Sequence, residues 1–155
     1  MEIKRVFLSK LTNNIRTNNR LFLILLLFLL AEVLINPIGE FPLNDDWAYA
    51  KIIKIIMLKG VVEPSEWGEA FFLTQMIWGL AFCKIFGFSF TVLRLSEVVV
   101  AFIGVIVFYR ILDGITQSKT LVSLGTILLV FNPVFLQQSN TFQSDIPLTV
   151  LSLIC

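Results

Sequence analysis

Two adjacent carboxylates are the strongest candidates for chemistry in this sequence. Asp45 and Asp46 lie in the stretch LNDDWAY, residues 43–49, shortly after the first long apolar run. An ionised carboxylate can act as a general base or bind a hard divalent metal ion. The pair also suits a helix start, where such acids contribute about 1 kcal/mol. Because two neighbouring acids there cannot both face one substrate, we expect one of them to have a chemical role and the other a supporting role.

A third acid, Asp145, closes a polar cluster over residues 137–145. Pro147 follows at a position typical of the first turn of a helix, so Asp145 is either a helix cap or part of an acidic site with Asp45.

Other candidate site residues are basic, polar or aromatic. Arg94 lies three residues before Glu97 on a predicted helix, so it forms either an ion pair with Glu97 or a phosphate site. Asn44, Trp47 and Tyr49 flank the acidic pair and are candidates for substrate binding. The two aromatic rings suit sugar stacking, and they equally suit the aromatic belt of a membrane interface.

The composition indicates an integral membrane protein. Of 155 residues, 57% are hydrophobic and 15% are charged, against roughly 25% charged in soluble domains. The mean hydropathy is +0.87. The sequence contains no histidine, which excludes histidine-based triads and imidazole metal sites, so acid–base chemistry must come from carboxylates. The two cysteines, Cys83 and Cys155, predict no disulfide framework.

The elements that must position these residues are apolar helices. Residues 1–20 form a basic arm, which predicts a cytoplasmic N-terminus and, joined directly to a span, argues against nucleic-acid binding. Residues 21–38 are long enough, at about 27 Å, to cross a membrane as an uncleaved anchor ended by Pro37 and Gly39. Later spans are predicted over residues 91–112 and 120–138, the second interrupted at Asn132-Pro133.

The intervening residues are predicted as loops with interfacial helices. Residues 39–90 form the first extracytoplasmic loop, with an amphipathic helix over residues 46–59, capped by Asn44 or Asp45 and stopped by Gly60. A second helix in that loop, residues 70–86, carries Lys84 and is expected to be interfacial or re-entrant. Residues 113–119 form a cytoplasmic loop, residues 139–146 an extracytoplasmic acidic loop, and residues 147–155 the start of a truncated helix. We therefore expect the N-terminal part of a longer polytopic protein.

The side on which the acids lie depends on residues 70–90. If these residues span, Asp145 lies on the cytoplasmic side, opposite to Asp45. If they do not span, Asp145 returns to the side of Asp45, and Arg110 and Lys119 become cytoplasmic. Lys84 then also stays out of the hydrocarbon, where a charge costs several kcal/mol. We expect the second arrangement.

These residues resemble the GT-C glycosyltransferases, in particular bacterial family 39 proteins related to protein mannosyltransferases and aminoarabinose transferases. The start of oligosaccharyltransferase catalytic subunits is more distantly similar. The resemblance covers roughly residues 15–155 and is carried by NDDWAYA (44–50), a helix ending at Gly60, FGFSF (86–90), LRLS (93–96), Asn132-Pro133, Thr141-Phe142 and DIPL (145–148). Many relatives have a Lys-Pro-Pro-Leu-like run where EWGEA (66–70) stands here, so their donor or acceptor preference is not transferred.

The resemblance implies an all-α polytopic membrane protein with a GT-C transmembrane helical bundle, in the plasma (inner) membrane. It implies transfer of a sugar from a polyprenyl-phosphate donor to an extracytoplasmic lipid, polysaccharide or protein acceptor, with inversion. Asp45 would be the catalytic or metal-binding acid, Asp46 its second member, and Asp145 the second acidic site. A divalent metal ion held by Asp45 and Asp145 would be the alternative to direct proton transfer. Later spans supply much of the donor site in such enzymes, so this part alone is expected to be inactive.

Non-catalytic alternatives remain open at this point. A transporter or a lipid-carrier-binding subunit would share the apolar spans, and a structural assembly partner would use residues 70–90 as an interface. A transporter should carry ionisable residues at mid-membrane depth in paired broken helices. Here the acids are expected at span ends, which favours chemistry at the membrane surface.

Overall fold

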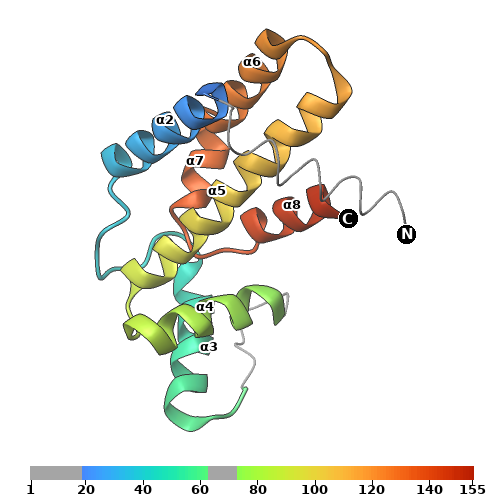
Figure 1. Cartoon of the computed structure of the whole chain (residues 1–155). Coiled ribbons are helices and arrows are strands. Elements are labelled where there is room, and N and C mark those ends of the chain that lie inside the picture. Colours follow the sequence, from blue (N-terminus) through green and yellow to red (C-terminus); the bar gives the residue numbers. More distant parts are fainter. Residues whose placement is uncertain (1–18, 63–72) are drawn as a thin grey trace.

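In the part that the computed structural model describes, residues 19–62 and 73–155, the chain forms helices joined by loops and turns (Figure 1). These residues contain no strand, so the predicted all-α class is confirmed. The helices are α2 (Asn19–Ile35), α3 (Asp46–Lys59), α4 (Leu73–Phe86), α5 (Phe90–Ile115), α6 (Lys119–Val130), α7 (Pro133–Ser139) and α8 (Asp145–Ile154).

The longest helix, α5, lies at the centre and contacts α2, α4, α6, α7 and α8. Its 26 residues correspond to about 39 Å, and within the described ranges it is the one unbroken helix long and apolar enough to cross a membrane. Helices α6 and α7 would make a second span if counted together, with a bend of 59° between them. The bend confirms the interruption predicted at Asn132-Pro133, because Pro133 begins α7 and Asn132 Oδ1 accepts from Val134 N at 2.9 Å.

Helix α2 ends at Ile35, three residues before the predicted end of the first span. A residue before proline is disfavoured in the α-helical region, and Asn36, which precedes Pro37, adopts a left-handed φ of 62°. Its side chain accepts a hydrogen bond from Ile38 N at 3.3 Å, which completes a tight turn. The chain therefore leaves the helix one turn early and enters the loop that carries the acids.

Two helices gather at the end of the bundle where α5 begins (Figure 1). Helix α3 covers residues 46–59 as predicted, and Gly60, with a φ of 69°, ends it in the left-handed region. Helix α4 has 14 residues within the described part and packs on both α3 and α5. It matches the predicted helix over residues 70–86 from Leu73 onward, and residues 70–72 lie outside the described part.

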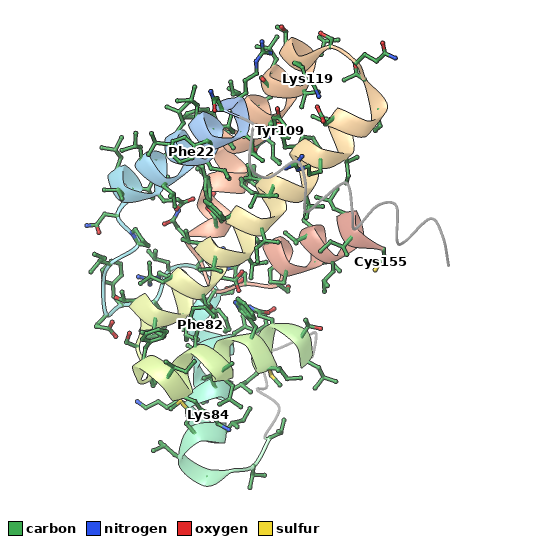
Figure 2. The ribbon with its side chains drawn as sticks, in the orientation of Figure 1. Phe22, Phe82, Lys84, Tyr109, Lys119 and Cys155 are labelled. Carbon is green, nitrogen blue, oxygen red and sulfur yellow. The ribbon has the colours of Figure 1, made fainter. Side chains whose placement is uncertain are left out.

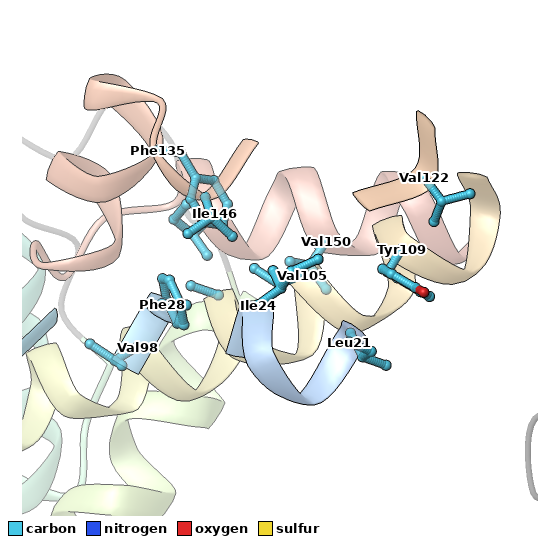
Figure 3. Close-up of a cluster of buried hydrophobic side chains, with 12 residues drawn as sticks. Leu21, Ile24, Phe28, Val98, Val105, Tyr109, Val122, Phe135, Ile146 and Val150 are labelled. Carbon is cyan, nitrogen blue, oxygen red and sulfur yellow. The ribbon is translucent and has the colours of Figure 1, made fainter. Parts of the chain in front are cut away.

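The interior consists of two apolar clusters. The larger one joins α2, α5, α6, α7 and α8 through side chains such as Phe28, Val105, Tyr109, Phe135 and Val150 (Figure 3). The smaller one joins α3 and α4 to the start of α5 and to the buried ring of Phe142. The second cluster thus fixes the two short helices against the same end of α5.

Two glycines of α5 offer a matched test of helix packing. A methyl group at Gly104 would lie 2.6 Å from Val150 Cγ2 of α8, whereas one at Gly114 would meet no described atom within 4 Å. We expect Gly104→Ala to lower the free energy of unfolding by about 1–3 kcal/mol through overpacking. Gly114→Ala should leave it unchanged or raise it by up to about 1 kcal/mol. Denaturation of both variants in detergent micelles, followed by circular dichroism, checks this, and equal losses would contradict the packing of α8 on α5.

Candidate active site

Asp46 is the buried member of the acidic pair and is bound on both carboxylate oxygens. Its Oδ1 accepts from Leu43 N at 2.8 Å, which ties the start of α3 to the preceding loop. Its Oδ2 accepts from Arg94 Nε and from an Arg94 terminal nitrogen, each at 3.3 Å. Burial raises the pKa of Asp46, while the bonds from Leu43 and Arg94 oppose that rise. The carboxylate of Asp46 therefore joins the loop before α3 to Arg94 of α5, which is a structural role.

Arg94 binds the loop that precedes α3. Its terminal nitrogens donate to the backbone oxygens of Gly39, at 3.1 Å, and Phe41. Its guanidinium also lies over the rings of Phe41 and Phe90, 5.1 and 5.8 Å from their centroids. With 1% of its side chain exposed, Arg94 holds the first loop on the start of α5. The phosphate-binding role of Arg94 stays a prediction. In this structure its guanidinium is buried and already bound to Asp46 and the loop.

The alternative in which Arg94 pairs with Glu97 is wrong. Arg94 turns toward Asp46, 48 residues away in sequence. Glu97 is fully buried, and neither of its carboxylate oxygens accepts a hydrogen bond from the described residues. Helical spacing alone suggested the pair, but the first loop supplies the guanidinium with more partners than Glu97 could.

Asp45 is exposed beside this buried pair. It occupies the N-cap position of α3, where its backbone oxygen accepts from Ala48 N at 3.1 Å, but its side chain makes no capping hydrogen bond. Asn44 precedes it with a left-handed φ of 53°. The predicted cap position is thus correct, but the Asp45 carboxylate does not bind the backbone N–H groups at the start of α3. This arrangement leaves Asp45 accessible for proton transfer.

The other residues predicted around the acids lie in different surroundings. Asn44 borders a cleft of about 470 Å³ that is also lined by Asn140 and Thr141. Trp47 is 36% exposed, and Tyr49 is half-buried against the smaller apolar cluster. Of these three, Asn44 alone faces the described cleft.

Asp145 is the first residue of α8 and is exposed. Its carboxylate interacts electrostatically with Glu97 of α5. Arg94, which binds Asp46, and Glu97, which interacts electrostatically with Asp145, are three residues apart and so lie about 4.5 Å apart along the axis of α5. The structure therefore brings the first-loop acids and Asp145 to the same end of α5.

A metal ion does not fit the described residues well. Hard divalent ions usually take several oxygen ligands from the protein. Asp46 is committed to Arg94 and Leu43 N, and no group of three or more acidic or cysteine side chains gathers within the described ranges. The described residues therefore do not support a metal ion held by Asp45 and Asp145.

Two buried or capping acids were not singled out as site residues. Glu32 of α2 accepts from Ser139 Oγ at 2.7 Å and from Asn140 Nδ2 at 2.5 Å, which joins α2 to the end of α7. Glu40 accepts from the backbone N–H groups of Phe90 and Thr91, at 3.1 and 3.4 Å, and so caps α5. The position of Glu32 within the first apolar run could have indicated that it has a buried polar partner. The capping role of Glu40 can be recognised only from the fold.

The Glu40 cap predicts a pH-dependent contribution to stability. Slight burial would raise the pKa of Glu40, but hydrogen bonds from Thr91 and Phe90 outweigh it and lower the pKa below the usual 4.5. The stabilisation is therefore present above pH 4.5 and is lost as the pH falls through the lowered pKa. We expect Glu40→Gln to cost about 1 kcal/mol of unfolding free energy at neutral pH. The difference from the parent chain should shrink in acid, and a pH-independent difference would contradict the ionised cap.

No family model, curated protein or solved structure matches this chain. Its function must therefore be inferred from its residues and their arrangement.

Proposed function

We propose that this chain belongs to a membrane-embedded glycosyltransferase of the GT-C type, which moves a sugar from a polyprenyl-phosphate donor to an extracytoplasmic acceptor. The observation that carries the proposal is the exposed Asp45 carboxylate beside the buried Asp46–Arg94 pair, at one end of α5. A lipid-linked donor requires a reactive group at this kind of position, because its phosphate and sugar lie at the membrane surface.

The surface of the helices supports a membrane location. Helix α2 turns one stripe inward and leaves large apolar side chains outward, such as Phe22 and Leu34, and α6 does the same with Leu128 (Figure 2 labels Phe22). Soluble monomers rarely expose contiguous apolar surfaces of this kind, whereas lipid covers them without cost.

The charges support an orientation for the bundle. Arg20 and Thr120 border one cleft, so the start of α2 lies beside the start of α6, and Lys119 begins α6. The acidic sites lie at the opposite end of α5, near Phe90 (Figure 1). By the positive-inside rule, the basic N-terminal arm predicts that the end with Arg20 and Lys119 is cytoplasmic and that the end with the acidic sites is extracytoplasmic.

In this proposal Asp45 accepts the proton of an acceptor hydroxyl. The acceptor oxygen then bonds to the anomeric carbon as the bond from that carbon to the donor phosphate oxygen breaks, which inverts the configuration. Polyprenyl phosphate leaves with the electron pair. Asp46 and Arg94 hold Asp45 in place, and Asp145 adds negative charge at the same end, where it would favour the developing positive charge on the sugar.

The bent pair α6–α7 is a feature that also suits a transporter. Glu32 binds the end of α7, where Ser139 donates to one of its carboxylate oxygens and Asn140 donates to the other. Glu32 is therefore not an open ion site. The geometry therefore favours surface chemistry over transport.

The orientation can be tested by cysteine labelling. In a background without Cys83 and Cys155, single cysteines at positions 45 and 145 should react with a membrane-impermeant maleimide from the extracytoplasmic side. A cysteine at position 119 should react only after the membrane is opened. Labelling of positions 45 and 145 from opposite sides would remove the two-acid site.

The activity itself requires a transfer assay. Vesicles containing the full-length protein should consume a radiolabelled polyprenyl-phosphate sugar and yield a labelled acceptor together with free polyprenyl phosphate. A panel of lipid-linked sugars that all remain intact would overturn the proposed function.

A further inference from the structure

The cleft between α2 and α6 lies away from the candidate active site, at the end of the bundle where both helices begin. It has a volume of about 440 Å³, which is within the usual range of ligand pockets. Leu21 of α2 lies with Val122 of α6 at one end of the larger apolar cluster, and Phe28 lies at the other end with Phe135 of α7 (Figure 3). Helices α2 and α6 therefore run in the same general direction on the two sides of the cleft.

The lining of this cleft changes from polar to apolar along both helices. Arg20 of α2 and Thr120 of α6 line it where the two helices begin. Leu27 and Ile127, seven residues further along each helix, line its other end. Seven helical residues correspond to about 10 Å. The cleft therefore fits a ligand with a polar head and an apolar chain.

The charge at the polar end selects an anion. Arg20 is exposed and forms no ion pair with any described residue, and none of the described residues that line the cleft is acidic. A guanidinium suits the oxygens of a phosphate group, and the hydroxyl group of Thr120 can donate a further hydrogen bond. Residues 1–20 of the sequence also contain five bases against one acid, a composition that attracts anionic lipids to the membrane surface.

The apolar end selects a lipid over a free anion. Leu23 of α2 and Leu124 of α6 line the cleft and are 55% and 53% exposed, so a hydrocarbon chain can enter from the side. A free phosphate ion would leave these apolar walls uncovered. An apolar helix of another protein would leave Arg20 without an anion. A phospholipid with a net negative charge satisfies both ends of the cleft.

We propose that the cleft between α2 and α6 binds one anionic phospholipid. Its phosphate group lies against Arg20 and Thr120, and one of its acyl chains lies along Leu23, Leu27 and Leu124. Because the lipid contacts both helices, its binding stabilises the packing of α2 on α6. The proposal depends on the membrane location of the bundle but not on sugar transfer.

Native mass spectrometry of the full-length protein in detergent micelles gives the dissociation constant of the first bound lipid. Phosphatidylglycerol should bind several-fold more tightly than phosphatidylcholine with the same chains, because the choline cation offsets the phosphate charge. Arg20→Gln should weaken phosphatidylglycerol binding about tenfold, as expected for one lost charge-assisted hydrogen bond. Arg16→Gln removes the same charge from the basic arm and should have a much smaller effect. Glycerol 3-phosphate, which carries the anionic group without the chains, should not displace the lipid.

Two exposed leucines of α6 provide a matched control for the apolar end. Leu124 lines the cleft, whereas Leu128, one turn later, does not. Leu124→Trp should therefore weaken binding of the first phosphatidylglycerol several-fold by filling the cleft, and Leu128→Trp should not. Both positions are exposed, so both variants should fold, which circular dichroism checks.

Four outcomes would overturn the proposal. Equal affinity for the two phospholipids would show that the headgroup charge is not recognised. Equal losses from Arg20→Gln and Arg16→Gln would show that only the net charge matters. Displacement by glycerol 3-phosphate would indicate a site for a free phosphate compound. An unchanged affinity in Leu124→Trp would place the lipid on another surface.

Discussion

Replacement of Asp45 by Asn is expected to lower the rate of sugar transfer by about 10²–10⁴-fold, the usual contribution of a general base. The amide keeps the size and the hydrogen-bonding shape of the side chain but cannot accept the proton of the acceptor hydroxyl. Because Asp45 is exposed and makes no capping bond, the variant should accumulate normally in the membrane and keep its stability. Initial rates of transfer from a radiolabelled polyprenyl-phosphate sugar, measured in vesicles at saturating donor, give the effect.

The matched control is the same substitution at the other end of α5. Asp113 pairs with Lys119 at 2.5 Å, and an ion pair with one exposed partner contributes at most about 1 kcal/mol. Asp113→Asn should therefore leave transfer within a few-fold of the parent rate. Near-normal transfer by Asp45→Asn at normal expression would exclude the catalytic role of Asp45.

The second large effect concerns stability. Asp46→Ala leaves the guanidinium of Arg94 buried and without its carboxylate, and we expect this to lower the free energy of unfolding by about 3–5 kcal/mol. Arg94→Ala should cost a similar amount, because it also removes the donors to Gly39 O and Phe41 O. Denaturant unfolding in detergent micelles, followed by circular dichroism, gives both values.

A double-mutant cycle identifies the pair itself. If Asp46 and Arg94 act together, the variant with both changes should lose less than the sum of the two single losses. Asp45→Ala is the matched control for Asp46→Ala and should stay within about 0.5 kcal/mol of the parent chain, as surface substitutions usually do. Strict additivity, or a loss from Asp45→Ala as large as that from Asp46→Ala, would contradict the buried pair.

The local elements could be predicted from the sequence because their signals are local. The repeat of apolar residues over 46–59 and the left-handed preference of Gly60 suffice for the bounds of α3. Asn132-Pro133 suffices for the break between α6 and α7. Even the end of α2, missed by three residues, follows a local rule, since Pro37 restricts the residue before it.

The residues of the candidate site could be named from the sequence, but their pairings could not. The acids at positions 45, 46 and 145 were recognisable by type and by their place after apolar runs. That Asp46 meets Arg94, and that Glu32 meets Ser139 and Asn140, depends on contacts across 48, 107 and 108 residues. Helical periodicity gives the face on which a side chain lies, but not the rotation and register of one helix against another.

Local signals suffice to predict apolar helices with carboxylates near their ends, because hydropathy, proline and glycine act within a few residues. That Asp46 is buried and Asp45 exposed depends instead on the tertiary structure. The loop of residues 36–45 folds back on the start of α5, and Arg94 can satisfy its buried charge only by taking Asp46 and the loop carbonyls together. That choice follows from the cost of leaving a buried charge unpaired, which is settled by the packed structure as a whole.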